Sequence, residues 1–442
     1  MRFSARLLRY LREATVPRLW PTGGLWRHPD FLKLWSAETV SQFGTQVGQL
    51  ALPLVAILEL DATAFEVAVL VTVQFLPFIF FTLPAGVWVD RVRRRPILIA
   101  GDLGRAALLA TVPITYAADA MTIWQLYVVS FLVGICTVFF DVAYQSYLPS
   151  LVERTRIIEG NSKFEVSRST AQIAGPGLGG ALVELFTAPY AVLVDAISFL
   201  GSGLFILGIR RIEEVPTESV HEMRPSLWSE LKEGLRFVLG NPALRGQAGC
   251  TATSNFFFSL GFAIILVYLV RELDLSAGII GVVLSLGSAG SLLAAVTTAR
   301  ISERYGVGPT AISAAFAAGP AMALVALAPQ DSPIPFLVVA QLILGFSVVV
   351  YNIMVVSYRQ AICPERLQGR MNSVMRFIVW GTIPLGTLAG GALGTWVGLR
   401  ETIAIGAIGA GSAFLWLLLS PMRSVRDMPT EPLDLVAEPA RA

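Results

Sequence analysis

Several ionisable side chains of this 442-residue sequence lie inside long apolar segments, where a charge is costly and indicates a function. Glu38 and Asp141 are two of them, and each shares one face of a predicted helix with other polar residues. Those residues are Ser41, Gln42, Thr45, Gln46 and Gln49 beside Glu38, and Thr137, Tyr144 and Gln145 beside Asp141. Because lipid does not accept such a face, we expect both to line a polar cavity. A carboxyl group enclosed there can bind and release a proton near neutral pH, so Glu38 and Asp141 are our candidate proton carriers.

A structural alternative exists for these charges. Asp141 could form only an ion pair, either with Arg105 or with the arginines that follow the second apolar segment. Asp102 and Arg105 are three residues apart on one predicted helix, and we interpret them as a structural pair. We also interpret Asp195 as structural. In the second half of the chain, the polar residues expected on the cavity are Asn255 and Asn352.

The elements that position these residues must be helices that cross a membrane. Hydrophobic residues make up 55% of the chain and charged residues 14%, about half the charged share of a soluble domain, which excludes a soluble enzyme. Twelve apolar segments are each long enough to span a bilayer. They cover residues 31–58, 67–89, 96–118, 121–148, 164–187, 188–209, 246–270, 275–299, 307–328, 333–358, 377–399 and 402–422. The predicted fold is therefore an all-α membrane protein with twelve transmembrane helices.

The positions of the basic residues support this count and give an orientation. Nearly all 33 lie in the N-terminal tail, the loops after even-numbered segments, the central stretch or the C-terminal tail. Only Arg271 and Arg400 lie in the opposite loops, while Lys33, Arg105 and Arg168 lie within segments. By the positive-inside rule both termini are then cytoplasmic, and we expect a multi-pass protein of a bacterial inner or plasma membrane.

A central polar stretch divides the chain into two halves. We expect a basic cytoplasmic tail at 1–30, a six-helix bundle at 31–209, a cytoplasmic loop at 210–245, a second bundle at 246–422 and a disordered tail at 423–442. Leucines at helical spacing in the second half of the loop predict a short amphipathic helix there.

The two halves repeat each other at an offset of 211 residues, as from Gly175 to Gly386. The repeat also relates Asp141 to Asn352, and the run from Gly179 to Leu182 to the run from Gly390 to Leu393. Two halves of equal topology predict two bundles related by an axis along the membrane normal, with the substrate site between them.

Two motifs resemble those of the major facilitator superfamily, and the resemblance covers all twelve segments. The loop after the second segment, GVWVDRVRRR, resembles the signature G-x-x-x-D-R-x-G-R-R, with Arg93 in place of its second glycine. The resemblance implies that Asp90 and Arg94 make charged contacts that close the cytoplasmic side. The gating residues it predicts are Gly86, Asp90, Arg91, Arg94 and Arg95.

In the fifth segment, Gly175, Pro176, Gly179 and Gly180 resemble the GPxxGG antiporter motif of drug exporters. Pro176 removes one helical hydrogen bond, and the glycines allow a neighbouring helix to approach closely. The central loop resembles the branch that includes macrolide and enterobactin exporters. Ser130 stands where other drug/proton antiporters of the superfamily carry an arginine in the fourth segment, which leaves proton coupling open.

This resemblance implies a secondary transporter: a proton-coupled exporter of small amphipathic compounds, such as a drug, siderophore or natural product, working by alternating access. Alternatives are a transporter-like receptor, a lipid scramblase, or an importer of a small metabolite. We expect no enzyme, because neither histidine lies in a segment, and no primary pump, because no lysine belongs to a P-loop. We expect no metal site, because none of the three cysteines belongs to a CxxC pair. We expect no cofactor beyond the proton gradient. The expected partners are a small-molecule substrate and the lipid bilayer; the net charge of +2 argues against nucleic acid, and a monomer suffices.

Overall fold

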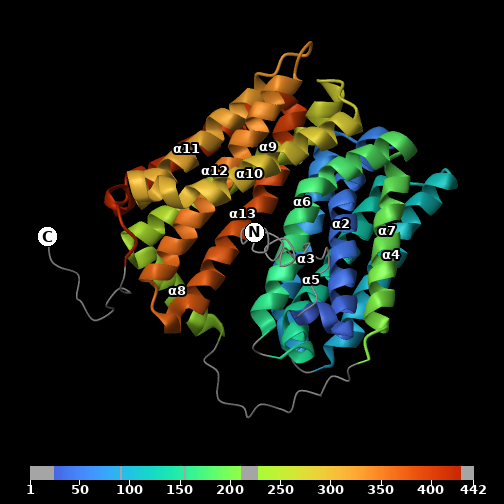
Figure 1. Cartoon of the computed structure of the whole chain (residues 1–442). Helices are drawn as coiled ribbons and strands as arrows, with labels where there is room; N and C mark the ends of the chain where they lie inside the picture. The colour runs from blue at the N-terminus through green and yellow to red at the C-terminus, as the bar shows by residue number, and fades with distance from the viewer. Residues whose placement is uncertain (1–23, 90–91, 154–155, 211–226, 430–442) are drawn as a thin grey trace, which may run out of the picture.

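The computed structural model describes residues 24–89, 92–153, 156–210 and 227–429. These ranges form α-helices and short 3-10 helices, and they contain no strand. Figure 1 shows two groups of long helices, one from each half of the chain, that meet at the upper end of the view and diverge toward the lower end, where α8 lies.

The first group carries the N-terminal half. It consists of η1 (Gly24–Arg27), α2 (Pro29–Leu58), α3 (Ala64–Val89), α4 (Arg94–Ala117), α5 (Ile123–Leu151), α6 (Ile157–Phe186) and α7 (Ala188–Leu207). The second group consists of α8 (Leu227–Gly240), α9 (Pro242–Arg271), α10 (Ala277–Tyr305), α11 (Val307–Ala326), α12 (Ile334–Ile362), α13 (Glu365–Trp396), α14 (Leu399–Ser412), α15 (Phe414–Leu418) and η3 (Pro421–Ser424). We call these groups the N-terminal bundle and the C-terminal bundle.

Many of these helices have the length and composition of membrane spans. Among the described residues, nine stretches qualify, from α3, α4, α5, α7, α9, α10, α11, α12 and the α14–α15 pair. The long helices α2, α6 and α13 coincide with the other three predicted segments, but they carry more polar residues. Large apolar side chains such as Trp124, Leu185 and Ile408 are more than half exposed, as expected for surfaces that contact lipid.

Three predicted boundaries differ from the structure. Residues 24–30 were expected in a tail, but η1 packs on the N-terminal bundle with Leu25 fully buried. The last segment is divided, since α14 ends at Ser412 and α15 begins at Phe414. The C-terminal tail begins later than expected, because the N–H groups of Val307 and Gly308 donate to the carbonyls of Arg426 and Val425. The first amides of a helix lack helical partners, so this stretch of chain satisfies those of α11.

Two helices begin well before their apolar segments. The helix α6 starts at Ile157 and α13 at Glu365, whereas apolarity predicts starts at residues 164 and 377. These added turns are polar and lie at the end of the molecule where α8 packs on α13 through the ion pair of Glu233 with Arg370. A search for apolar residues misses such turns because helix formation continues beyond the hydrocarbon layer.

The added turns of α6 hold η1 in place. Oε1 of Glu159 accepts a hydrogen bond from the N–H of Leu25 at 2.9 Å. Nζ of Lys163 lies 3.4 Å from Oε1 of Glu159 and 4.1 Å from the centre of the Trp26 ring. The hydrogen bond from Leu25, followed by that from Lys163, lowers the pKa of Glu159.

Acidification should therefore weaken the attachment of η1. A carboxyl group whose pKa is lower in the folded than in the unfolded protein stabilises the folded state at pH values above its unfolded pKa of about 4.3. This stabilisation is lost as pH falls through the folded pKa. The wild type should melt at a higher temperature than Glu159→Gln at neutral pH, and the difference should close at acidic pH. Thermal unfolding in detergent across this range measures it. The control Glu153→Gln, in an exposed loop, should follow the wild type, and a difference for Glu159→Gln that does not change with pH would contradict the assignment.

Candidate functional site

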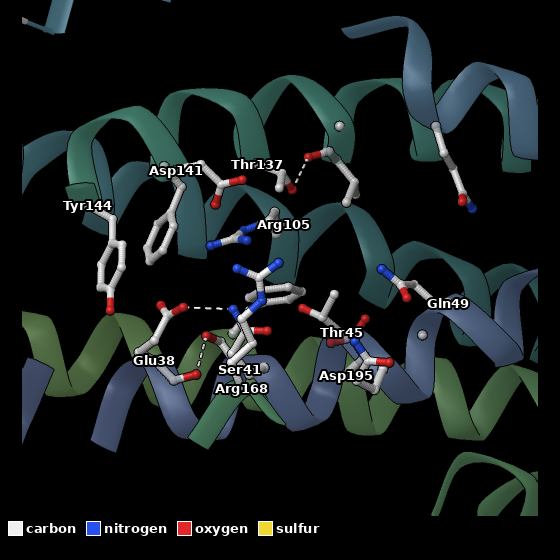
Figure 2. Close-up of a pocket in the computed structure, with 18 of the residues that line it drawn as sticks. Glu38, Ser41, Thr45, Gln49, Arg105, Thr137, Asp141, Tyr144, Arg168 and Asp195 are labelled. Atoms are coloured by element: carbon white, nitrogen blue, oxygen red, sulfur yellow. Dashed lines mark hydrogen bonds between the residues drawn. The ribbon is translucent and has the colours of Figure 1, made fainter. Parts of the chain in front are cut away.

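A cavity of about 710 Å³ lies within the N-terminal bundle. All six long helices of this bundle contribute to its wall, and on α2 the lining extends from Glu38 to Leu52. The predicted candidates on this cavity are Glu38, Gln42, Thr45, Gln46, Gln49, Asp141, Tyr144 and Gln145. The polar faces of α2 and α5 thus lie on one cavity, as Figure 2 shows. The functions assigned to these residues remain predictions.

Glu38 is enclosed by the cavity wall. Its side chain is buried, and Oε1 accepts a hydrogen bond from Nε2 of Gln42 at 2.7 Å. Oε2 is also buried, but no described group donates a hydrogen bond to it. An ionised carboxylate accepts several hydrogen bonds, so a bare buried oxygen disfavours the charge and leaves room for a proton on Glu38.

Asp141 differs from Glu38 because its side chain is exposed to the cavity space. Among the described residues it forms no ion pair within 4 Å, so the predicted alternative of a direct pair with Arg105 is not what the structure contains. The positive charges of Arg105 and Arg168 nevertheless act on it electrostatically. Tyr144 lies one turn away, with its ring 5.2 Å from that of Phe164 and its buried hydroxyl without a described hydrogen-bond partner.

Two residues that we interpreted as structural lie on the cavity instead of away from it. Arg105 forms the expected ion pair with Asp102 at 2.5 Å, but its side chain also lines the cavity. Asp195 of α7 lines it as well, against α2 at Gly48, where an added Cβ would lie 2.1 Å from Oδ2 of Asp195. The sequence signal was Gly44 and Gly48, since two glycines one turn apart on α2 leave room for a side chain of another helix.

Other predicted residues lie elsewhere. Asn255 and Asn352 are not part of this cavity wall, which contains only residues of the N-terminal bundle. Asp90 and Arg91 fall outside the described residues, and of Gly86 only its place in α3 is described. Arg95 donates hydrogen bonds to the carbonyls of Ile206 and Leu207, at 3.3 and 2.7 Å, and so satisfies the C-terminal end of α7. Arg94 is described at the start of α4.

The motif in α6 contacts α10 of the other bundle through its backbone. Pro176 has no N–H, so the carbonyl of Gln172 lacks its helical partner. Oγ of Ser288 in α10 donates to that carbonyl at 3.3 Å. One residue further, the N–H of Gly177 donates to Oγ of Ser285 at 2.9 Å. The proline thus frees a backbone carbonyl of α6, and that carbonyl and the neighbouring N–H both bind α10.

The glycines of this motif face two different helices. A Cβ on Gly180 would lie 2.9 Å from Cα of Gly281 in α10, so these helices touch backbone to backbone across the two bundles. Gly175 and Gly179 instead face α2, where an added Cβ would meet Gln46 at 2.3 Å and the backbone of Val47 at 3.3 Å. One helix therefore joins the cavity-lining α2 to the other bundle.

The repeated motif in α13 makes the corresponding contacts. An added Cβ on Gly386 or Gly390 would clash with backbone carbonyls of α9, and one on Gly391 would lie 2.4 Å from Ala68 of α3. The hydroxyl oxygens of Thr72 and Thr387 lie 2.6 Å apart across the same contact of α3 with α13. The sequence repeat therefore corresponds to a repeat of packing, with α6 against α10 and α13 against α3.

Two further contacts join the bundles at the end remote from α8. Nη2 of Arg271 at the end of α9 lies 2.6 Å from Oδ1 of Asp61 in the loop between α2 and α3. Oε2 of Glu184 accepts a hydrogen bond from the N–H of Gly278 in the first turn of α10 at 3.1 Å. The positive end of the α10 dipole favours that carboxylate.

Comparison with known proteins places the chain among transporters. The family described as transmembrane secretion effector matches residues 24–441. The multidrug efflux pump Tap of Mycolicibacterium fortuitum is 27% identical over 386 residues, which cover 85% of this chain and 91% of that protein. The macrolide efflux protein A of Streptococcus pyogenes is 23% identical over 214 residues, covering 48% of this chain and 52% of that protein.

Solved structures show the same fold. An inward-facing bacterial homologue of the iron transporter ferroportin has a TM-score of 0.69 at 16% identity, with 89% of this chain and all of that chain covered. An outward-facing structure of such a homologue has a TM-score of 0.54 at 17% identity, with 88% and 98% covered.

Proposed function

Because the chain belongs to the transmembrane secretion effector family of the major facilitator superfamily, and is thus a membrane transporter and not an enzyme, we propose that it is a proton-coupled exporter of small amphipathic compounds. The observation that carries the proposal is the polar cavity of the N-terminal bundle, in which Glu38 and Asp141 lie among amide and aromatic side chains. Ionisable groups at such a depth are retained where they serve transport.

The arrangement of the bundles supports alternating access. The described contacts between the bundles lie in the half of each helix that is farther from α8, on α3, α6, α9, α10 and α13. Toward α8 the two bundles diverge (Figure 1). With both termini and α8 in the cytoplasm, this is an inward-facing state, which agrees with the higher TM-score to the inward-facing structure. All twelve long helical units then cross the membrane, including the more polar α2, α6 and α13.

The cavity lining supports the substrate class. The wall contains both amides, such as Gln42 and Gln49, and aromatic rings, such as Phe75, Tyr144 and Phe164. This mixture suits bulky, weakly polar molecules better than sugars or phosphates, which need dense hydrogen bonding. The named efflux proteins that resemble the chain act in the same direction, out of the cell. We place the protein in the cell membrane as a monomer that uses the proton gradient as its energy source.

Transport by the full-length protein in liposomes tests the proposal. Ethidium, a fluorescent amphipathic probe, should be concentrated against its gradient when a pH gradient is imposed, and this accumulation should stop when the gradient is dissipated. Protein-free liposomes are the control. Accumulation that ignores the pH gradient would refute proton coupling. Rapid flipping of a fluorescent phospholipid without ethidium transport would identify a scramblase instead.

A further inference from the structure

We infer that Arg105 is a positioning residue that controls how readily the carboxyl groups of the cavity take up a proton, and that Asp102 sets the strength of its effect. The importance of Arg105 for transport rests on the proposed proton coupling, whereas its effect on proton uptake can be measured without transport. The inference comes from how this guanidinium is held and from what it faces.

The guanidinium of Arg105 is fixed within the N-terminal bundle. Nη2 lies 2.5 Å from Oδ1 of Asp102, and the other carboxylate oxygen accepts a hydrogen bond from Ser202 at 2.7 Å. The rings of Phe140 and Phe199 flank the guanidinium, with their centres 4.3 and 4.0 Å from Cζ. Both charged side chains are almost completely buried, at 5% and 0% exposure. The ion pair and the two ring contacts together hold the guanidinium in one position beside the cavity.

The carboxylate of Asp102 does not use all the hydrogen-bond donors of the Arg105 guanidinium. Arginine has five N–H donors, and the bond to Asp102 uses one. Nε is buried and has no hydrogen-bond partner among the described groups. The side chain also lines the cavity, so part of its positive charge acts on that space.

Titratable and charged groups face Arg105 from every neighbouring helix. Its charge acts electrostatically on Glu38, Asp141 and Asp195, which come from three different helices. In Figure 2 the guanidinium groups of Arg105 and Arg168 lie between Glu38 and Asp141. The facing groups are Glu38 of α2, Cys136, Asp141 and Tyr144 of α5, Glu165 and Arg168 of α6, and Asp195 of α7. Arg105 is therefore the buried cation shared by three cavity carboxyl groups.

The two members of the ion pair should have opposite effects. A positive charge in an enclosed site stabilises ionised carboxylates, so removing Arg105 should make the cavity carboxyl groups hold protons more tightly. Neutralising Asp102 leaves the same cation without its compensating charge, so the cavity carboxyl groups should hold protons less tightly. A residue that only supports packing would not produce shifts of opposite sign.

Infrared titration of the purified full-length protein in lipid nanodiscs measures this effect. The C=O stretch of protonated carboxyl groups is followed against pH, and its loss in Glu38→Gln, Asp141→Asn and Asp195→Asn assigns the band. Arg105→Gln should raise the midpoint by about one pH unit or more, and Asp102→Asn should lower it. Arg105→Lys, which keeps the charge, should titrate near the wild type.

The control uses an arginine of the other bundle. Arg304 lies in the last turn of α10 and does not line the cavity, so Arg304→Gln should leave the midpoint unchanged. If Arg105→Gln does not fold because it strands the charge of Asp102, the double variant Asp102→Asn/Arg105→Gln removes both charges together. Its midpoint should lie above that of Asp102→Asn.

Equal midpoints in the wild type and Arg105→Gln would overturn the inference, as would shifts of the same sign for Arg105→Gln and Asp102→Asn. A double variant whose midpoint does not lie above that of Asp102→Asn would overturn it as well. Failure of the proposed function has a different signature. Transport would then not respond to a pH gradient, while the opposite shifts would still occur.

Discussion

Replacing Asp141 with Asn should abolish export against a gradient and leave downhill exchange of substrate intact. Asn is nearly isosteric with Asp and mimics the protonated carboxyl group, so the cavity and its opening remain while the proton can no longer be released. The repeat-related position in the second half is Asn352, so the fold already accepts an amide there. Gradient-driven and downhill transport of ethidium, measured at matched protein amounts in liposomes, give the two rates.

The outcomes separate a proton carrier from a structural charge. Removal of one partner of a buried ion pair typically costs about 3–5 kcal/mol, and it would lower protein amount and both transport rates together. Asp119→Asn, in an exposed loop, serves as the control and should transport as the wild type does. If Asp141→Asn still concentrates substrate in response to pH, Asp141 is not the carrier, and Glu38→Gln is tested with the same two assays.

Replacing Gly180 with Leu should shift the protein away from the inward-facing state. An added Cβ would lie 2.4 Å from the carbonyl oxygen of Ala277 and 2.9 Å from Cα of Gly281, so the larger side chain cannot fit between α6 and α10. Overpacking costs roughly 1–3 kcal/mol, which changes a balanced equilibrium by about fivefold to more than a hundredfold. In the alternating access that we propose, this contact exists only while the bundles are closed at that end, so the cost falls on the inward-facing state.

Spin-label distances can measure this shift. Labels at Asp119 and Asp331, in exposed loops of the two bundles, should report longer distances in Gly180→Leu, and substrate turnover should fall. Gly201→Leu in α7 is the matched control, because nothing lies within 4 Å of a Cβ at that position. Unchanged distances and turnover in Gly180→Leu would mean that this contact does not control the closed state.

Much of the architecture follows from the sequence because hydrocarbon tolerates few polar side chains and no unpaired backbone groups. A segment in hydrocarbon must be apolar and must satisfy its own backbone, so the apolar segments coincide with the long helices. The same constraint places the stripe from Glu38 to Gln49 on the cavity, since a row of amides has no other place in a membrane. The glycine repeat likewise predicts close contacts, and Gly179 and Gly390 both have them.

The sequence alone does not determine which helix a residue faces. We interpreted Arg105 and Asp195 as structural charges, and only the packing of α4 and α7 against α2 and α5 turns them toward the cavity. Backbone partners across the bundles, such as Ser288 for the carbonyl of Gln172, are equally invisible in a one-dimensional pattern. The composition of a segment and the spacing of its polar residues thus determine that a helix forms and how polar each of its faces is. Which neighbour occupies each face depends on contacts between distant residues, and those exist only once the chain has folded.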